Sequence, residues 1–397
     1  MLPKVGSVAW LPGLKGDSMN SAAARATTDS TVDELLTLIC HHLQITDSQQ
    51  TQAETRYQAL GRVLETPRSP LFGHRLGLYP QGSLKLGTTV KPLGREEFDL
   101  DLVCELETDA RRFPHPPQLI TSIASYLNSL PAYVGKVRPK NRCVRIVYAD
   151  QFHLDLLPAC QDPANGGTHL LVPDRNSQSW KPSNPKGYAK WFESRCAYTP
   201  RLVEGKSEPI PPKEPVVLKP TLKLATQLLK RWRDLKYAER KSVAPISIVL
   251  TTLAGLHFNG QDSVSAALVE ILGNIVGKLP APNFRLVVWN PVNRAEDLSE
   301  KWNENPEAYY AFARDIREFR EHMHGIVARQ SLDSLCKKLS KVFGEDVSKS
   351  VMTRFGRELE QRRNAGNLYV QGHTGSLSKI AAAGVATVIR PHTFYGR

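Results

Sequence analysis

Two aspartates, Asp99 and Asp101, stand one residue apart in a segment that is otherwise apolar. The period-two pattern of Phe98–Cys104 predicts a half-buried strand. Because residues i and i+2 of a strand point to the same face, both carboxylates converge on one spot. Such carboxylates repel each other unless a cation lies between them, and Mg²⁺ is commonly held by protein carboxylates, phosphates and water. An Asp-x-Asp pair alone is more often a solvated strand edge, so the metal interpretation depends on further residues.

A third carboxylate, Asp155, lies in a second strand pattern, Phe152–Leu157, with His153 on the same face. If this strand pairs beside the first, Asp155 comes next to the other two aspartates. Three carboxylates suit a two-metal site, in which one ion activates an attacking hydroxyl and the other neutralises a triphosphate. Taken alone, Asp155 is better explained as an edge residue.

A glycine-serine turn precedes these strands. Gln81, Gly82 and Ser83 follow an apolar run and stand before Gly87-Thr88-Thr89. Glycine lets the backbone approach a ligand closely, so the free N–H groups and the hydroxyl of such a turn can hold phosphate oxygens. By itself a Gly-Ser pair predicts no more than a turn.

The elements that must position these residues divide the chain into two halves. The first half predicts helices at about 31–43, 50–65 and 117–129, strands at 134–137, 143–148 and 152–157, turns over 70–94, a loop over 160–184 and a helix from Asn184-Pro185 to Cys196. From Val216 onwards helices dominate, at about 219–240, 245–257, 263–277, 296–303, 306–324, 331–342 and 346–362, with one strand at 284–289.

Composition sets the class of protein. The 397 residues predict about two lobes, and the net charge of +13 favours an anionic partner without choosing among nucleic acid, nucleotide and acidic membrane. The six cysteines form no CxxC pair, which argues against a zinc site. There is no signal-peptide core and no apolar run of about 18 residues. We therefore expect a cytoplasmic protein with reduced thiols and no membrane partner.

The order of these motifs resembles a known family. The pattern Gly82-Ser83-x3-Gly87-Thr88, then Asp99-x-Asp101, then Asp155 resembles the DNA polymerase-β-like nucleotidyltransferase superfamily. Within it, the chain is most similar to the bacterial cGAS/DncV-like nucleotidyltransferases (CD-NTases). Four further segments carry the likeness: Leu228-Leu229-Lys230-Arg231-Trp232, Pro245-Ile246-Ser247, Asn290-Pro291-Val292-Asn293, and Trp180 with Asn184-Pro185 and Tyr188.

The resemblance implies an α+β fold with two lobes. It predicts a nucleotidyltransferase core with a mixed sheet at 30–215, a helical lobe at 216–365 and a C-terminal tail at 366–397. The Gly, Ser, Ala and Thr content of residues 1–29 predicts a flexible N-terminal segment before them. The active site would lie in the cleft between core and helical lobe.

The resemblance also implies roles for single residues. Asp99, Asp101 and Asp155 would be the catalytic ligands of two Mg²⁺ ions, with Mn²⁺ as an alternative, and Asp155 would help to deprotonate the acceptor hydroxyl. Ser83 and the backbone at Gly82, assisted by Gln81, would bind the donor triphosphate. Lys230 would reach that triphosphate too, although Lys223 lies seven residues earlier on the same helical face and is an alternative. Ser247, at a helix start, would contact phosphate.

One departure concerns base recognition. Cyclic GMP–AMP synthase and oligoadenylate synthase carry a base-stacking aromatic residue just after the position of Ser247, whereas this chain has Ile248. Trp180, Tyr188 and Trp191 are available for stacking, but each is equally suited to the core. Base selectivity therefore does not follow from the resemblance.

The implied activity is synthesis of a cyclic di- or trinucleotide messenger from ATP and/or GTP in anti-phage (CBASS) signalling. A downstream effector would read the product, and the tail would bind an operon-encoded regulator or conjugation partner. No nucleic acid would be obligatory. Two alternatives stay open: an RNA 3′-end nucleotidyltransferase of the poly(A) or CCA-adding type, and a relative that has lost activity. The basic run from Lys136 to Arg145 favours the first, although its charges alternate as on a solvated face.

Overall fold

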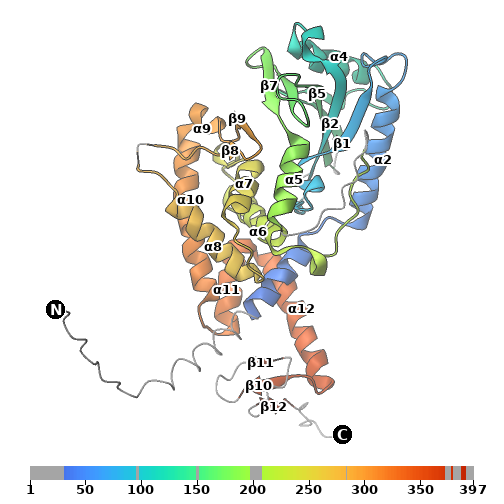
Figure 1. Cartoon of the computed structure of the whole chain (residues 1–397). Helices are drawn as coiled ribbons and strands as arrows, with labels where there is room; N and C mark the ends of the chain where they lie inside the picture. The colour runs from blue at the N-terminus through green and yellow to red at the C-terminus, as the bar shows by residue number, and fades with distance from the viewer. Residues whose placement is uncertain are drawn as a thin grey trace, which may run out of the picture.

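A seven-stranded mixed sheet frames the first lobe (Figure 1). The computed structural model describes residues 31–94, 98–148, 152–196, 208–282, 284–371, 377–378 and 386–389. The main strand path is β1-β2-β5-β4-β3, and a β6–β7 hairpin continues from β5. The bounds are β1 Leu76–Pro80, β2 Phe98–Asp109, β3 Val137–Pro139, β4 Val144–Tyr148, β5 Phe152–Gln161, β6 Leu170–Asp174 and β7 Ser179–Ser183. β2 and β5 are parallel, and the remaining paired strands of this sheet are antiparallel.

Alternation along the central strands gives the sheet two different faces. Leu100, Leu102, Leu154 and Leu156 are buried against helices α2 (Asp47–Leu64) and α4 (Pro116–Asn128). Asp99, Asp101 and Asp155 alternate with those leucines and therefore lie on the opposite face. The helices thus cover the apolar face and leave the carboxylates on the side that meets the second lobe.

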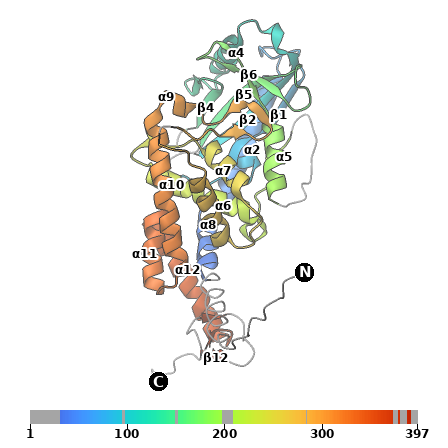
Figure 2. The ribbon, with the colours of Figure 1, turned by 60° about the vertical axis from the view of Figure 1, so that its left-hand side comes forward.

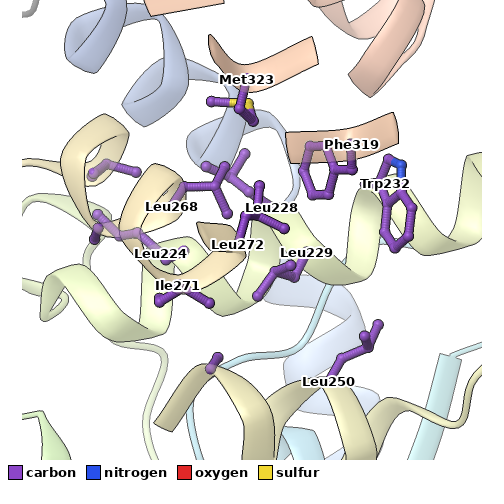
Figure 3. Close-up of a cluster of buried hydrophobic side chains, with 14 of the residues drawn as sticks. Leu224, Leu228, Leu229, Trp232, Leu250, Leu268, Ile271, Leu272, Phe319 and Met323 are labelled. Carbon is purple, nitrogen blue, oxygen red and sulfur yellow. The ribbon is translucent and has the colours of Figure 1, made fainter. Parts of the chain in front are cut away.

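The second lobe is built around helix α6, Thr221–Lys236, which is buried along most of its length. Its apolar side chains pack against α8 and α10, and Trp232 stacks on Phe319 (Figure 3). The other elements of this half are α7 Ser247–His257, α8 Val264–Gly277, β8 Trp289–Asn290, β9 Asn293–Asp297, α9 Lys301–Glu304, α10 Pro306–Val327, α11 Leu332–Phe343 and α12 Glu345–Asn364. Short 3₁₀ turns at Ala110–Arg112, Val216–Leu218 and Lys241–Val243 link neighbouring elements.

Two earlier segments join this helical core. The helix at 31–42 and α5, Pro185–Arg195, bury apolar residues in the same cluster as α6, α7 and α8. Both helices precede the predicted division at 215/216 in sequence, yet they pack in the helical core that follows it. Figure 2 shows α12 extending away from the body of the molecule, with the small strands beyond its end. Those strands are β10 Tyr369–Gln371, β11 Leu377–Ser378 and β12 Ala386–Val388.

The α+β class with a mixed sheet and many helices is confirmed, but several local predictions are wrong. The predicted turn region 70–94 contains β1 and the short helix α3, Gly82–Lys85, and the predicted loop 160–184 contains the β6–β7 hairpin. Prolines at 173 and 182 concealed that hairpin, since proline normally argues against a strand. The strand expected at 134–137 is β3 at Val137–Pro139. The strand expected at 284–289 and the helix at 296–303 are instead the β8–β9 hairpin followed by α9.

The predicted flexible segment 1–29 lies outside the described residues, as does much of the predicted tail 366–397. Among the helices that the structure describes, none combines the length and the apolar character that a membrane span requires.

Candidate active site

The parallel pairing of β2 with β5 brings the three aspartates together. Asp101 lies directly opposite Asp155 in the register, and Asp99 lies opposite His153. The Asp99 side chain is 56% exposed, whereas the Asp155 side chain is 15% exposed. The strand that was predicted to place Asp155 beside the Asp-x-Asp pair therefore does so.

Arg145 closes this carboxylate group from the next strand. It lies opposite Asp155 in the antiparallel β4–β5 pairing. Its Nε donates to Asp155 Oδ1 and its Nη2 to Asp155 Oδ2, both at 2.7 Å, while Nη2 lies 3.4 Å from Asp99 Oδ1. The guanidinium thus bridges two of the three carboxylates. Sequence reasoning placed Arg145 on a solvated basic face and missed this contact, because cross-strand partners leave no local signal.

Like charges and burial raise the proton affinity of the group. Burial raises the pKa of Asp101 to about 7, with further increases from Asp99 and Asp155 and opposition from Lys230 and Arg145. The pKa of Asp99 is also raised, mainly by its partial burial. A carboxylate cluster whose negative charge is under-compensated is the donor set that a hard cation requires.

A donor set of this chemistry suits Mg²⁺, for which Asp99, Asp101 and Asp155 would be the ligands. In the described part of the chain, no three His, Cys, Asp or Glu side chains already surround one point closely enough for an ion. The Arg145 guanidinium, which pairs with Asp155 and approaches Asp99, supplies positive charge where the ion's charge would act.

The turn at Gly82 contacts the carboxylates directly. Gly82 has φ +61°, and a Cβ on it would overlap Asp101 Oδ2 and lie 3.2 Å from Asp101 Cγ. The backbone N–H of Gln81 also donates to the backbone carbonyl of Asp101 at 2.8 Å, which fixes the turn to β2. Glycine is therefore required both by the backbone conformation and by the close approach. Ser83 follows, with its Oγ accepting from Thr89 Oγ1 at 3.3 Å.

A pocket of about 320 Å³, here called the small pocket, joins this turn to the helical lobe. Lys230 is buried in it and donates from Nζ to the Thr88 carbonyl at 3.2 Å and to Thr88 Oγ1 at 3.0 Å. Burial, and then the neighbouring Arg233, lower the pKa of Lys230 to about 7. The small pocket is lined by the turn, three carboxylates and two basic groups: Gly82, Ser83, Thr89, Asp99, Asp101, Asp234, Lys230, Arg233, Ser247 and Ile248, among others.

Arg233 is a basic residue of the small pocket that sequence reasoning did not single out. It donates from Nη1 to Ser247 Oγ and is also paired with Asp234. The available signal was its spacing of three residues from Lys230, which puts both side chains on one face of α6. Lys230, Arg233 and Ser247 thus give the small pocket the cation and hydroxyl set that suits a polyphosphate.

Lys223 lies elsewhere. Its Nζ is 2.9 Å from Glu214 Oε2, and it lines a separate pocket of about 540 Å³ together with Lys219. Seven residues of helix correspond to about 10 Å along its axis, so residues on the same face need not reach the same ligand. The structure therefore brings Lys230, and not Lys223, to the carboxylates.

A larger pocket of about 670 Å³, here called the large pocket, shares Gly82, Asp101 and Ile248 with the small pocket. Gln81, Asp155 and Arg145 line it near the carboxylates, Tyr188 and Ile248 line its wall, and Asn290, Glu296 and Glu300 line it on the helical lobe. Its size suits nucleosides, and its junction with the small pocket lies at the carboxylates.

The aromatic candidates for base stacking separate into two groups. Tyr188 lines the large pocket, and its hydroxyl is 2.9 Å from Thr252 Oγ1. Trp180 packs edge-on against Phe113 beside the sheet core, and Trp191 packs against Tyr188 beside the helical core. Neither tryptophan lines the large or the small pocket. Of the residues that the sequence singled out, Tyr188 and Ile248 thus contribute to the apolar lining that a base could contact.

Comparison with known proteins finds similar chains among nucleotide-messenger synthases. Residues 30–195 match the family model of the Second Messenger Oligonucleotide or Dinucleotide Synthetase domain (SMODS). A c-di-GMP synthase of Roseivirga ehrenbergii is 28% identical over 92% of this chain and 97% of its own length. The cyclic dinucleotide synthase CdnG of Bradyrhizobium diazoefficiens is 27% identical over 92% of this chain and 94% of its own length.

Solved structures show the same fold. CdnG of Bradyrhizobium diazoefficiens in complex with GTP superposes with a TM-score of 0.65 at 24% identity, covering 82% of this chain and 99% of that chain. The cyclic AMP-GMP synthase DncV of Vibrio cholerae, a prokaryotic cGAS homologue, gives a TM-score of 0.52 at 16% identity, covering 85% and 93%. The SMODS match over residues 30–195 and the two near full-length relatives support a bacterial CD-NTase.

Proposed function

We propose that this protein synthesises a cyclic dinucleotide from GTP and/or ATP, with a cyclic trinucleotide as the alternative product. The observation that carries the proposal is the meeting of two pockets at Asp101, one lined by cations and hydroxyls and one large enough for nucleosides. The named activities of the two near full-length relatives, c-di-GMP synthase and cyclic dinucleotide synthase, support it.

The chain's own residues would act mainly by positioning and charge neutralisation. Lys230, Arg233 and Ser83 would hold the β- and γ-phosphates of the donor in the small pocket. The acceptor hydroxyl would approach from the large pocket, in line with the bond from the α-phosphorus to the departing pyrophosphate. A first attack gives a linear dinucleotide, and a second equivalent attack after reorientation closes the ring.

Asp155 is the proposed acceptor of the hydroxyl proton, because it lies where the large pocket meets the other carboxylates. Mg²⁺ bound at Asp99, Asp101 and Asp155 would neutralise the triphosphate and make the hydroxyl more acidic. For Asp155 to act in this way, its bidentate pair with Arg145 must loosen. The triphosphate in the cleft offers the guanidinium another anionic partner.

RNA 3′-end addition is the weaker proposal. Two members of the basic run that favoured it are committed to ion pairs inside the cleft: Arg145 with Asp155, and Arg142 with Asp174 and Glu300. They are therefore not a free cationic surface for an RNA backbone.

We also propose a cytoplasmic setting for the protein and a role in anti-phage signalling. An effector would read the product, and the tail 366–397 would bind a partner.

The direct test is incubation of the purified protein with labelled ATP and GTP, Mg²⁺ and no primer. We expect phosphatase-resistant small products, whose base composition and linkage mass spectrometry and nuclease digestion define. Labelling that requires added RNA or tRNA would contradict the proposal and favour the RNA-modifying alternative. Absence of any product with all four nucleoside triphosphates would favour a relative that has lost activity.

The two lysines of α6 give a matched pair of variants. We expect Lys230→Met to lower kcat/KM by about 10²-fold or more, because it removes a buried cation from the small pocket. Lys223→Met removes a cation from the separate 540 Å³ pocket and should change kcat/KM less than about threefold. Initial rates measured across nucleotide concentrations distinguish the two. An equal loss in both variants would show that the small pocket is not the triphosphate site.

A further inference from the structure

The far wall of the large pocket carries two glutamates with different surroundings. Glu300 lies on the helical lobe, and its Oε1 accepts from Arg142 Nη2 at 2.6 Å. Arg142 also donates from Nε to Asp174 Oδ2 at 2.7 Å, so this arginine is paired with two carboxylates, Glu300 and Asp174. Glu300 is thus already neutralised by a cation.

Glu296, on β9, is not neutralised in this way. In the described part of the chain, no Lys, Arg or His lies within ion-pair distance of it. Asn290 Nδ2 donates to its Oε2 at 2.8 Å, which orients the carboxylate. Burial raises the pKa of Glu296, opposed by hydrogen bonds and by Arg142. A partly buried carboxylate of this kind gains from additional neutral donors.

The position of Glu296 makes a nucleobase the natural source of those donors. It lines the same pocket as Asp101 and Asp155, whereas the Gly82-Ser83 turn with Lys230 and Arg233 lies in the small pocket, which meets the large pocket at Asp101. The large pocket also holds cations, of which Arg142 and Arg145 are paired with carboxylates. β9 contacts β7, so this wall is fixed against the sheet lobe. A nucleotide with its phosphates at the carboxylates would extend its base along the large pocket toward this wall.

The chemistry of the Watson–Crick edge selects one purine. A carboxylate only accepts hydrogen bonds, and guanine offers two adjacent donors, N1–H and the N2 amine, which can meet its two oxygens. Adenine presents an acceptor at N1, which would face a carboxylate oxygen and repel it. We propose that Glu296 reads the Watson–Crick edge of guanine and makes GTP the preferred purine nucleotide of this protein. This inference rests on the proposed function for its substrate class.

Binding measurements test the base preference without turnover. We would titrate the full chain with non-hydrolysable GTP and ATP analogues by isothermal calorimetry. We expect the wild-type protein to bind the GTP analogue about 10-fold or more tightly than the ATP analogue. Glu296→Gln should remove or reverse this preference, because a glutamine amide offers one donor and one acceptor and so matches adenine. Equal wild-type affinities, or a preference that changes less than twofold in this variant, would overturn the proposal.

Glu300→Gln is the matched control, since it makes the same chemical change on the same pocket wall. We expect it to affect both analogues alike and to leave their ratio unchanged, and a ratio shift equal to that of Glu296→Gln would overturn the proposal. If Glu296→Gln fails to fold, inosine triphosphate tests the wild-type protein, because it lacks only the N2 amine. It should bind about 10-fold more weakly than GTP, and equal binding would overturn the proposal.

The outcomes for this inference and for the proposed function are separable. If the protein makes no product in the primer-free assay but prefers guanine through Glu296, the synthase activity is refuted and the role of Glu296 in base recognition stands. If both the wild-type and the Glu296→Gln protein form product and use ATP and GTP equally, the synthase activity stands and the role of Glu296 is refuted. A competition assay with both labelled nucleotides reports that ratio directly.

Discussion

Asparagine in place of Asp101 should abolish nucleotidyl transfer and, at the same time, stabilise the protein in the absence of divalent cations. We expect activity to fall by roughly 10³-fold or more, since the change removes the candidate metal ligand that lies between Asp155, its cross-strand partner, and the Gly82 turn. Stability should rise because the variant no longer carries a charge that burial, Asp99 and Asp155 all disfavour.

The pH dependence of this stabilisation has a defined sign. The pKa of Asp101 is about 7 in the folded protein and about 4 in an unfolded chain, so the folded state binds the proton more tightly. Its contribution to the free energy of unfolding is therefore complete below about pH 4 and is lost as pH rises toward 7 and beyond. In EDTA, the melting temperature of Asp101→Asn should exceed that of the wild type by several degrees at pH 8 and by little at pH 5.

Mg²⁺ supplies the complementary measurement. It should raise the melting temperature of the wild type at pH 8 and raise that of Asp101→Asn much less. Asp109→Asn, at the far end of β2 and paired with Arg111 on the surface, is the control. Asp109→Asn should retain activity, and its melting temperature at pH 8 in EDTA should not exceed that of the wild type. An Asp101→Asn protein that kept a tenth of its activity, or melted below the wild type at pH 8 in EDTA, would contradict the assignment.

Gly82→Ala should have the second-largest effect. The new Cβ would overlap Asp101 Oδ2, and alanine would also be strained at φ +61°. We expect a loss of activity of about 10²-fold or more and a decrease of about 1–3 kcal/mol in the free energy of unfolding. Steady-state rates and urea unfolding measure the two effects.

Gly73→Ala separates strain from overlap. Gly73 also has positive φ, +85°, but nothing lies within 4 Å of the position of a Cβ. This variant should lose about 1 kcal/mol of stability from backbone strain and keep wild-type turnover. If both variants lost activity to the same degree, the contact between Gly82 and Asp101 would not be the cause.

Local patterns were enough to find the carboxylates. Asp99 and Asp101 stand out through strand periodicity, and Asp155 through a second apolar strand. The pairing of β2 with β5 had to be assumed, because register is set by contacts between segments far apart in sequence. Arg145 was misplaced for the same reason, since its partner lies across the sheet. Lys223 and Lys230 share a helical face, and only the position of the cleft along α6 distinguishes them.

The elements that sequence reasoning missed have weak local signals. The β6–β7 hairpin includes two prolines, and its Asp174 is held by Ser177 and Arg142 through contacts that no pattern reveals. The β8–β9 hairpin contributes Glu296 to the large pocket, yet its strands are short and polar. Short elements depend on tertiary contacts more than on propensity, so their boundaries were the least predictable part of the site.

The helix at 31–42 has a consequence for the order of folding during synthesis. Cys40 Sγ donates to the Leu224 carbonyl, 184 positions later, and Glu34 pairs with Arg362 near the end of α12. At about 5–20 residues per second, a ribosome needs roughly 10–40 s after adding Cys40 to add Leu224. This helix therefore waits, with its apolar face uncovered, until α6 has been synthesised. The helical lobe can be completed only near the end of translation.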